Sequence, residues 1–373
     1  MRLMDFTLVL ALQNQNKNNM KLNFTKGAAV VLMSLLFGTS ATQAQDMTEA
    51  TAFLKAGSED AGVYMGKYLN PMVKGLGYGV AGGWYNTAKT HKPLGFDITV
   101  TLNASRAPED DFFFDIIETD YQNIQLKDPN QPSTSTLFGD ETTTGITAEY
   151  YDETYDRTIV SEFETAPGLA LDDSYNGYVP MPMVQAGIGL IKNTDLKVRW
   201  MPTQRFNDDY DNESSVGMFG LGLMHDFKQW IPAIKHIPID MAVLVGYNRI
   251  YAKSGLNSNG EVIDGENQQG EVGINSWTYQ LLVSKKLSVL TLYGGVGYNN
   301  TTTNLKVLGT YVIEDDNTGA TVTLTDPIDE DYLSSGMRGT LGMRLKLAII
   351  TIHADYTFQE YNTITAGIGF SVR

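Results

Sequence analysis

The chain has 373 residues, with 43 Asp and Glu against 27 Lys and Arg, which gives a formal net charge of −16. This acid excess argues against a nucleic-acid partner, because phosphate binding needs a basic surface. The absence of cysteine excludes disulfides, thiolate metal sites, cysteine nucleophiles and a lipoprotein anchor. The 36 glycines and 20 tyrosines, with only 19% charged residues, favour strands and turns over packed helices.

Residues 1–44 are predicted to be a signal peptide that directs export. They combine the three parts of such a signal, which are a basic start at 21–26, an apolar run over 27–37 and a small-x-small cleavage site at 42–44. The run is too short to cross a membrane as a helix, which takes about 20 residues. The alternative interpretation is a buried N-terminal helix. Met20 is a second candidate start, because the residues before it add only a polar tail.

Helix-forming residues follow the cleavage site. The sequence predicts one helix over 48–56 that ends at Gly57, and a second over 59–69 that ends before Asn70-Pro71. Because these helices precede the strands, we interpret residues 45–76 as a helical plug segment. The short stretch after residue 76 is expected to join the plug or to pair with a strand.

From Gly77 onward the periodicity is that of strands. Apolar and polar residues alternate along 96–105, which is the pattern of a strand with two different faces. The pattern recurs in ten segments, each about twice as long as the five or six residues usual in soluble sheets. These segments are 95–106, 181–191, 195–204, 214–226, 237–252, 271–286, 288–303, 333–347, 349–359 and 361–372.

Alternation alone does not separate a soluble sandwich from an outer-membrane barrel, but three other features favour the barrel. The strands are long enough to cross a membrane, which takes about 9–11 tilted residues. Apart from a tight turn at 360, short connections alternate with long polar ones. Seventeen acidic residues crowd 107–180, whereas lysines mark the short connections. We therefore predict an all-β protein in the cell outer membrane, with a single antiparallel transmembrane β-barrel over 77–373 and 107–180 as an acidic extracellular region.

The barrel is expected to have more than ten strands. The 107–180 region is too long for an ordinary loop. It contains strand-like segments at 112–117, 145–151 and 158–164. Two or four extra strands there would give 12 or 14, both even numbers, as in bacterial single-chain barrels.

Ionisable residues on the polar strand faces form the candidate site. An Arg or Lys on the lipid side costs roughly 2–4 kcal/mol, so these residues are expected to face the lumen and to pair there. They either form a structural network that fills a narrow barrel or line a path for a substrate, and their mixed signs favour the network. The candidate lumen-lining residues are Asp97, Lys197, Arg199, Asp240, Arg338, Arg344, Lys346, His353 and Asp355.

No motif points to an enzyme, a cofactor or a metal site. Gly77–Gly82 matches G-x-G-x-x-G, but no βαβ unit surrounds it, and we interpret it as a chance match in a glycine-rich strand. The four histidines lack metal-ligand spacing. The acidic clusters 208–213 and 326–331 carry oxygen ligands of the kind that calcium prefers. Solvated, mutually repelling loops are the favoured interpretation of both clusters.

The chain resembles an uncharacterised family of Gram-negative outer-membrane barrel proteins. The resemblance lies at 83–101, which reads Gly-Trp-Tyr-Asn-Thr-Ala-Lys-Thr-His-Lys-Pro-Leu-Gly-Phe-Asp-Ile-Thr-Val-Thr, and at 225–232, which reads His-Asp-Phe-Lys-Gln-Trp-Ile-Pro. It implies the fold and the compartment, and the family has no established activity. More distantly, the layout is similar to that of long-chain fatty-acid transporter barrels, which have an N-terminal plug before 14 strands.

We expect a plugged barrel that binds a small hydrophobic molecule or passes it through the lumen. Its expected partners are outer-membrane lipid, this small ligand and the barrel assembly machinery, with no nucleic acid. The alternative is a structural or adhesive surface barrel that acts through acidic extracellular loops. An outer-membrane enzyme is the least favoured hypothesis, because no nucleophile–base pair is visible in the sequence.

Overall fold

The computed structural model describes residues 52–152, 156–169, 177–207, 213–233, 236–256, 264–314 and 321–372. The expected signal peptide, the cleavage site and Met20 lie outside these residues. So does most of the acidic cluster 208–213.

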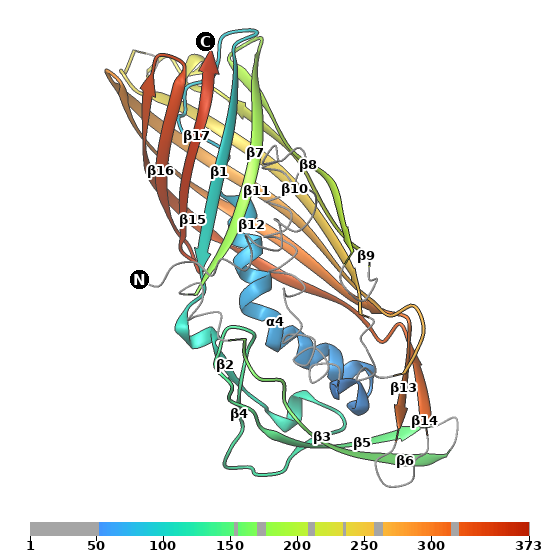
Figure 1. The fold of residues 1–373 in the computed structure, drawn as a ribbon. Coiled ribbons are helices and arrows are strands. Elements are labelled where there is room, and N and C mark those ends of the chain that lie inside the picture. The colour runs from blue at the N-terminus through green and yellow to red at the C-terminus, as the bar shows by residue number, and fades with distance from the viewer. Residues whose placement is uncertain are drawn as a thin grey trace, which may run out of the picture.

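Ten antiparallel strands close into a barrel in the order β1-β17-β16-β15-β12-β11-β10-β9-β8-β7 (Figure 1). All ten correspond to the ten segments expected from alternation. Strand β1 closes the ring, because it pairs with β17 on one side and with β7 on the other. The strands are β1 (Phe96–Arg106), β7 (Tyr178–Leu190), β8 (Thr194–Asn207), β9 (Glu213–His225), β10 (Asp240–Gly255), β11 (Gln269–Leu287), β12 (Leu290–Leu308), β15 (Ile328–Leu347), β16 (Ile350–Phe358) and β17 (Thr363–Val372).

The prediction of 12 or 14 strands is wrong, because the strand-like segments between β1 and β7 lie outside the barrel. They form two small sheets, β2-β4 and β3-β5-β6, and a further hairpin joins β13 to β14. Even β5 and β6, at eight residues each, are shorter than a membrane strand. The bounds are β2 (Phe113–Asp115), β3 (Ile124–Leu126), β4 (Ser133–Ser135), β5 (Gly145–Asp152), β6 (Arg157–Glu164), β13 (Thr310–Glu314) and β14 (Thr321–Thr325).

The barrel wall is apolar outside and polar inside, which is the reverse of a soluble sandwich. On β16 the exposed side chains include Ile350, Ile352, Tyr356 and Phe358. The alternate, buried ones are Thr351, His353, Asp355 and Thr357. An apolar outer band over a polar interior is the pattern of barrels that sit in lipid. The alternation seen in the sequence therefore has the orientation expected of a membrane barrel.

Helix α4 (Ser58–Ala81) precedes the barrel and comes after a short 3-10 helix, η1 (Ala52–Ala56). The predicted end before Asn70-Pro71 is wrong, because α4 continues through Pro71 for ten more residues. The Gly77–Gly82 motif is therefore not in a strand: it forms the last turn of this helix and the residue after it. Three further 3-10 turns are η2 (Glu109–Asp111), η3 (Glu118–Asp120) and η4 (Lys228–Trp230).

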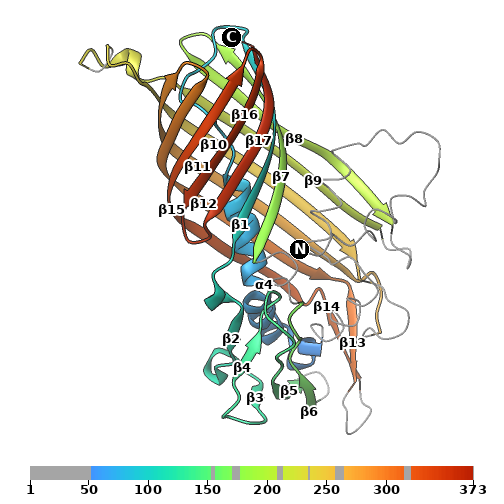
Figure 2. The same ribbon diagram turned by 60° about the vertical axis from the view of Figure 1, so that its left-hand side comes forward.

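The first half of α4 contacts the region 107–180 and Tyr332 of β15, and its second half lies against the barrel strands (Figure 2). Asp60 accepts hydrogen bonds from the backbone N–H groups of Gln122 and Asn123, both at 2.7 Å. The hydroxyl of Tyr64 accepts one from the N–H of Ala166 at 2.9 Å. The acidic region 107–180 is thus attached to the start of the helix.

Residues 82–95 continue from α4 through the barrel to its other end. The N–H of Leu94 donates to the carbonyl of Gly189 at 2.9 Å, beside the turn that joins β7 to β8. We call this the short-turn end, because β1 begins and β17 ends there. The opposite end, which carries the region 107–180, is the long-connection end. The segment Ser58–Gly95 therefore runs from the long-connection end to the short-turn end, and we call it the lumen segment.

Among the described residues, no helix combines the length and the apolar character that crossing a membrane requires.

Candidate functional site: the lumen and the segment that fills it

The barrel strands carry all nine candidate lumen residues. Asp240 and Lys346 are half-buried. The other candidates are buried, and they are Asp97, Lys197, Arg199, Arg338, Arg344, His353 and Asp355. Burial of so many ionisable groups requires hydrogen-bond partners inside the barrel, and the lumen segment supplies several of them.

Arg199 on β8 holds the end of α4. Its guanidinium donates to the carbonyl of Val80 at 2.9 Å and to that of Gly82 at 2.6 Å, while its Nε donates to Gln185 at 3.1 Å. The first carbonyl belongs to the last turn of α4 and the second to the residue that follows it, where C=O groups lack helical partners and carry partial negative charge. The guanidinium also lies 3.6 Å from the ring centroid of Trp84. Arg199 therefore caps the helix and fixes the chain that leaves it.

Trp84 anchors a small apolar cluster within the lumen. It is fully buried and packs with Tyr85 and Ala88 of the lumen segment. The strands contribute Met224, Ala242, Leu244, Leu282 and Tyr293. The cluster gives the lumen segment a hydrophobic contact between its two polar attachments.

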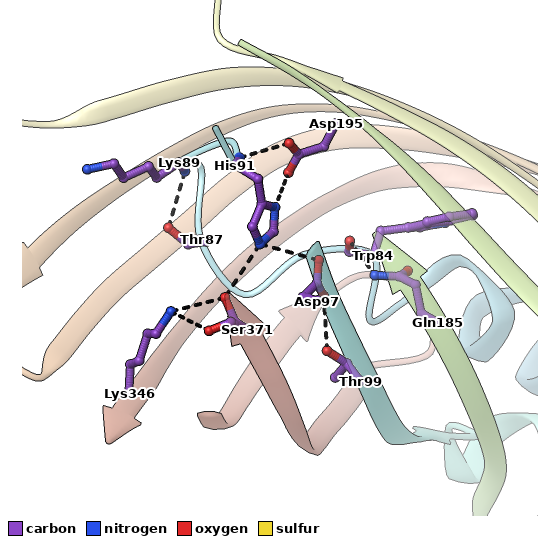
Figure 3. Close-up of polar contacts among 10 residues, drawn as sticks. All are labelled: Trp84, Thr87, Lys89, His91, Asp97, Thr99, Gln185, Asp195, Lys346 and Ser371. Atoms are coloured by element: carbon purple, nitrogen blue, oxygen red, sulfur yellow. Dashed lines mark hydrogen bonds and ion pairs between the residues drawn. The ribbon is translucent and has the colours of Figure 1, made fainter. Parts of the chain in front are cut away.

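His91 forms the second polar attachment, near the short-turn end (Figure 3). Its backbone N–H and its Nδ1 both contact the carboxylate of Asp195 at 2.8 Å. Its Nε2 lies 3.4 Å from the hydroxyl of Ser371 and 3.7 Å from the carboxylate of Asp97. Lys346 donates to the carbonyl of Ser371 at 2.8 Å. We call these five residues the His91 latch, because they join the lumen segment to β1, β8, β15 and β17.

The order Asp195–His91–Ser371 is that of an acid, a base and a hydroxyl nucleophile. Ser371 is only 1% exposed, and Lys346 already donates to its hydroxyl at 3.2 Å. A nucleophile needs space for a substrate beside it. We therefore interpret the three residues as part of the attachment.

The remaining candidates lie in smaller groups. Asp355 accepts a hydrogen bond from the hydroxyl of Tyr293 at 2.7 Å. Asp240 accepts one from Ser284 at 3.5 Å. Arg344 stands directly opposite His353 in the β15–β16 register. The structure thus brings Asp97 and Lys346 together in the His91 latch. Arg199 lies apart from them at the end of α4, and Asp240 lies beside Ser284.

Sequence reasoning missed the partners that the lumen segment supplies. Asp195 and Ser371 both fall on polar strand faces, so alternation indicates that they point inward. His91 lies before the first strand, in a stretch without regular periodicity, and no local signal brings it to Asp195. Trp84 is likewise visible only as part of a segment that resembles a family.

An open cavity of about 590 Å³ lies at the long-connection end. Its lining combines residues of α4 with the chain around β2 and with Tyr332 of β15. Two apolar side chains of the lining are exposed, Phe113 by 40% and Ile117 by 53%. Within the parts of the chain that the structure describes, no group of three His, Asp or Glu is placed to hold a metal.

A protein-family model described as a family of unknown function (DUF6588) matches residues 20–372. The expected resemblance to a barrel family without an established activity is thereby confirmed. No curated protein matches the chain.

Three solved barrels are similar in fold. The translocator domain of the autotransporter NalP from Neisseria meningitidis is 10% identical, with a TM-score of 0.29, over 76% of this chain and 90% of that one. The attachment invasion locus protein Ail of Yersinia pestis is 12% identical, with a TM-score of 0.24, over 48% and 95%. A loop-deletion mutant of OmpT, an outer membrane protein of Vibrio cholerae, is 12% identical, with a TM-score of 0.23, over 74% and 76%.

Proposed function

The chain belongs to this family of unknown function, and we propose that it is an outer-membrane barrel that binds a small hydrophobic molecule and passes it through the lumen when the lumen segment moves. One observation carries the proposal. The lumen segment fills the barrel between its two ends and is held by hydrogen bonds and packing, in a chain without cysteine to fix it covalently. Such contacts can be exchanged without breaking a covalent bond.

The wall of the barrel supports the compartment. An apolar outer face suits outer-membrane lipid as the surrounding partner. In barrels of this kind the short turns face the periplasm and the long connections face outward. The acidic region 107–180 would then lie outside the cell. The barrel assembly machinery is the partner that would insert such a chain.

The cavity at the long-connection end supports the class of ligand. Phe113 and Ile117 expose apolar surface there, and a hydrophobic molecule that covers this surface removes it from water at about 25 cal/mol per Å². Val63 and Gly66 of α4 line the same cavity. A ligand bound there touches the helix whose far end Arg199 holds, so binding and movement of the lumen segment have a direct physical link.

The adhesive alternative has less support. The contacts of region 107–180 run inward to α4, as those of Asp60 and Tyr64 show. A region built on the helix in this way acts as a cover for the lumen segment.

The test is the conductance of the purified full chain in planar lipid bilayers. Arg199→Ala removes four hydrogen bonds, two to carbonyls at the end of α4 and two to the side chains of Gln185 and Asn248 on the wall beside it. Hydrogen bonds to a charged group contribute about 1.5–3 kcal/mol each. We therefore expect the open probability to rise at least about tenfold above that of the unmodified chain.

The matched control is Arg205→Ala, on the same strand. Arg205 is exposed and pairs with Glu213 at 3.4 Å. This change should leave the conductance as it is. If Arg199→Ala also leaves it unchanged while the barrel still folds, the lumen segment is a permanent filling and the passage proposal fails.

A further inference from the structure

A polar patch lies on the inner wall of the barrel, across three neighbouring strands. In the register, Gln280 of β11 stands opposite Gly297 of β12, which stands opposite Arg338 of β15. One step along, Thr278, Asn299 and Gly336 form a second row. These positions alternate with outward-facing ones, so both rows face the lumen. We call Gln280, Arg338, Thr278 and Asn299 the inner-wall patch.

All four side chains are buried, and all carry polar atoms without a protein partner. Arg338 is 4% exposed, and its Nε and Nη1 have no hydrogen-bond partner among the described residues. Both side-chain polar atoms of Asn299 are in the same condition, as are Thr278 Oγ1 and Gln280 Oε1. Buried polar groups are nearly always paired, and an unpaired one costs about 1–3 kcal/mol or more. Four neighbouring side chains with unpaired polar atoms therefore indicate a place where a polar ligand binds.

Arg338 differs in this respect from Arg199, whose guanidinium is occupied by carbonyl groups of the lumen segment. Asp355 lies close enough to interact with Arg338 electrostatically, but it accepts its hydrogen bond from Tyr293. A guanidinium pairs well with a carboxylate, to which it can donate two parallel hydrogen bonds. The donors in the patch thus call for a negatively charged acceptor.

We propose that the inner-wall patch binds the carboxylate of a small organic acid. The guanidinium of Arg338, the amide of Asn299 and the hydroxyl of Thr278 supply N–H and O–H donors, and a carboxylate offers about four acceptor sites. The oxygens of Asn299 and Gln280 accept from any hydroxyl group that the acid carries. Gly297 and Gly336, which have no side chain, lie between the polar side chains. The inner-wall patch adds a class of ligand to the proposed function. Passage of the acid through the barrel rests on that proposed function, whereas binding of the acid depends on the patch alone.

The position of the patch connects it to the lumen segment. A Cβ added to Gly336 would lie 3.3 Å from the hydroxyl of Tyr78 on α4, and one added to Gly295 would lie 2.7 Å from that of Tyr85. An acid bound on the patch therefore lies next to the segment that would have to move.

The test measures binding of benzoate to the detergent-solubilised full chain by saturation-transfer NMR. Benzamide, which has nearly the same shape but no charge, is the comparison ligand. We expect saturable binding of benzoate and much weaker binding of benzamide. Arg338→Gln should weaken benzoate binding at least about tenfold, because it removes a charge-assisted contact. Arg106→Gln is the matched control, since Arg106 is exposed and pairs with Glu109 outside the lumen; it should bind benzoate as the unmodified chain does.

Two further variants still test the proposed site if Arg338→Gln does not fold, which heat-modifiable gel mobility will show. Arg338→Lys retains the positive charge and should retain part of the binding. Asn299→Asp leaves Arg338 in place but sets a carboxylate beside it, and should abolish binding. Equal binding of benzoate and benzamide, no binding of either, or binding unaffected by these changes would show a hydrated wall and overturn the assignment. If benzoate binds but Arg199→Ala does not raise the conductance, the proposed binding site is retained and the proposed passage through the lumen is rejected.

Discussion

Trp84 shows how individual wall residues set the position of the lumen segment. Its indole lies against β9 and β10 where both strands have glycine. A Cβ added to Gly222 would lie 2.7 Å from the ring, and one added to Gly246 would lie 2.5 Å from it. No real Cβ approaches so closely, so the missing side chains make the space that the ring occupies. The wall and the segment are therefore fitted to each other at the level of single methyl groups.

Gly246→Ala tests this fit. The added methyl group overpacks the Trp84 site, which typically costs about 1–3 kcal/mol. We expect the temperature at which the folded band disappears on heat-modifiable gels to fall. Gly273→Ala on β11 is the control, because a Cβ there meets nothing within 4 Å and alanine favours a strand over glycine. Equal temperatures for the two variants would mean that Trp84 is not tightly packed.

The sequence predicted the wall side of the candidate site but not its other half. The inward direction of Arg199, Arg338 and Asp355 follows from a period of two, which a strand imposes on its side chains. Their partners Trp84 and His91 lie in the irregular stretch before β1. Contacts between such a stretch and a strand depend on the closed barrel, so no local pattern encodes them.

Helix α4 shows the same limit at the scale of an element. Proline removes one N–H and usually ends or kinks a helix, which is why the sequence predicted an end before Pro71. The helix continues because its later turns are packed against the barrel, and tertiary packing supplies most helix stability. Gly79 belongs to this packing, since a Cβ there would lie 3.2 Å from that of Met181.

A polar tie at the long-connection end joins α4 to the turn between β16 and β17. Lys74 pairs with Glu360 at 2.7 Å, and the hydroxyl of Tyr78 donates to the same carboxylate at 2.7 Å. Burial raises the pKa of Glu360, but these hydrogen bonds and the Lys74 charge outweigh burial and hold that pKa below its usual value. A lowered carboxyl pKa stabilises the folded chain above the pKa of the unfolded state, and this contribution is lost as pH falls through the lower folded-state pKa.

Glu360→Gln should therefore lower the free energy of unfolding at neutral pH. It should also reduce the further decrease of that free energy as pH falls below about 4.5. Glu360 is 46% exposed, so solvent screens the pair and the effect should be small. The measurement is the denaturation midpoint as a function of pH. A variant whose pH profile matches that of the unmodified chain would show that the tie contributes nothing.

At the scale of the whole molecule, the alternation of apolar and polar residues located every barrel strand. The inference that the barrel needs two or four additional strands was wrong. The ten alternating segments are already even in number. The expectation of extra strands rests on the length of 107–180, which is unusual for a loop, and β5 and β6 are indeed strands. Strand propensity marks an extended segment, but it does not say which sheet the segment joins.

Orientation can be tested on intact cells. An epitope inserted after Asp128, in the exposed turn between β3 and β4, should be accessible to antibody from outside, because in barrels of this kind the long connections face outward. The same epitope inserted after Ser288, in the short turn between β11 and β12, should become accessible only when the outer membrane is opened. The reverse labelling, or no labelling of either site, would contradict the proposed placement.

The position of β1 has a consequence for how the molecule assembles. This strand comes directly after the lumen segment and also forms the seam with β17, from which it is separated by more than 250 residues of chain. Seams between such distant segments form late, because loop closure costs entropy before any contact forms. The strand that completes the ring is thus tethered to the segment inside it, so threading and closure are two parts of one folding step. A barrel that closed first would have to admit an entire helix afterwards through its own lumen.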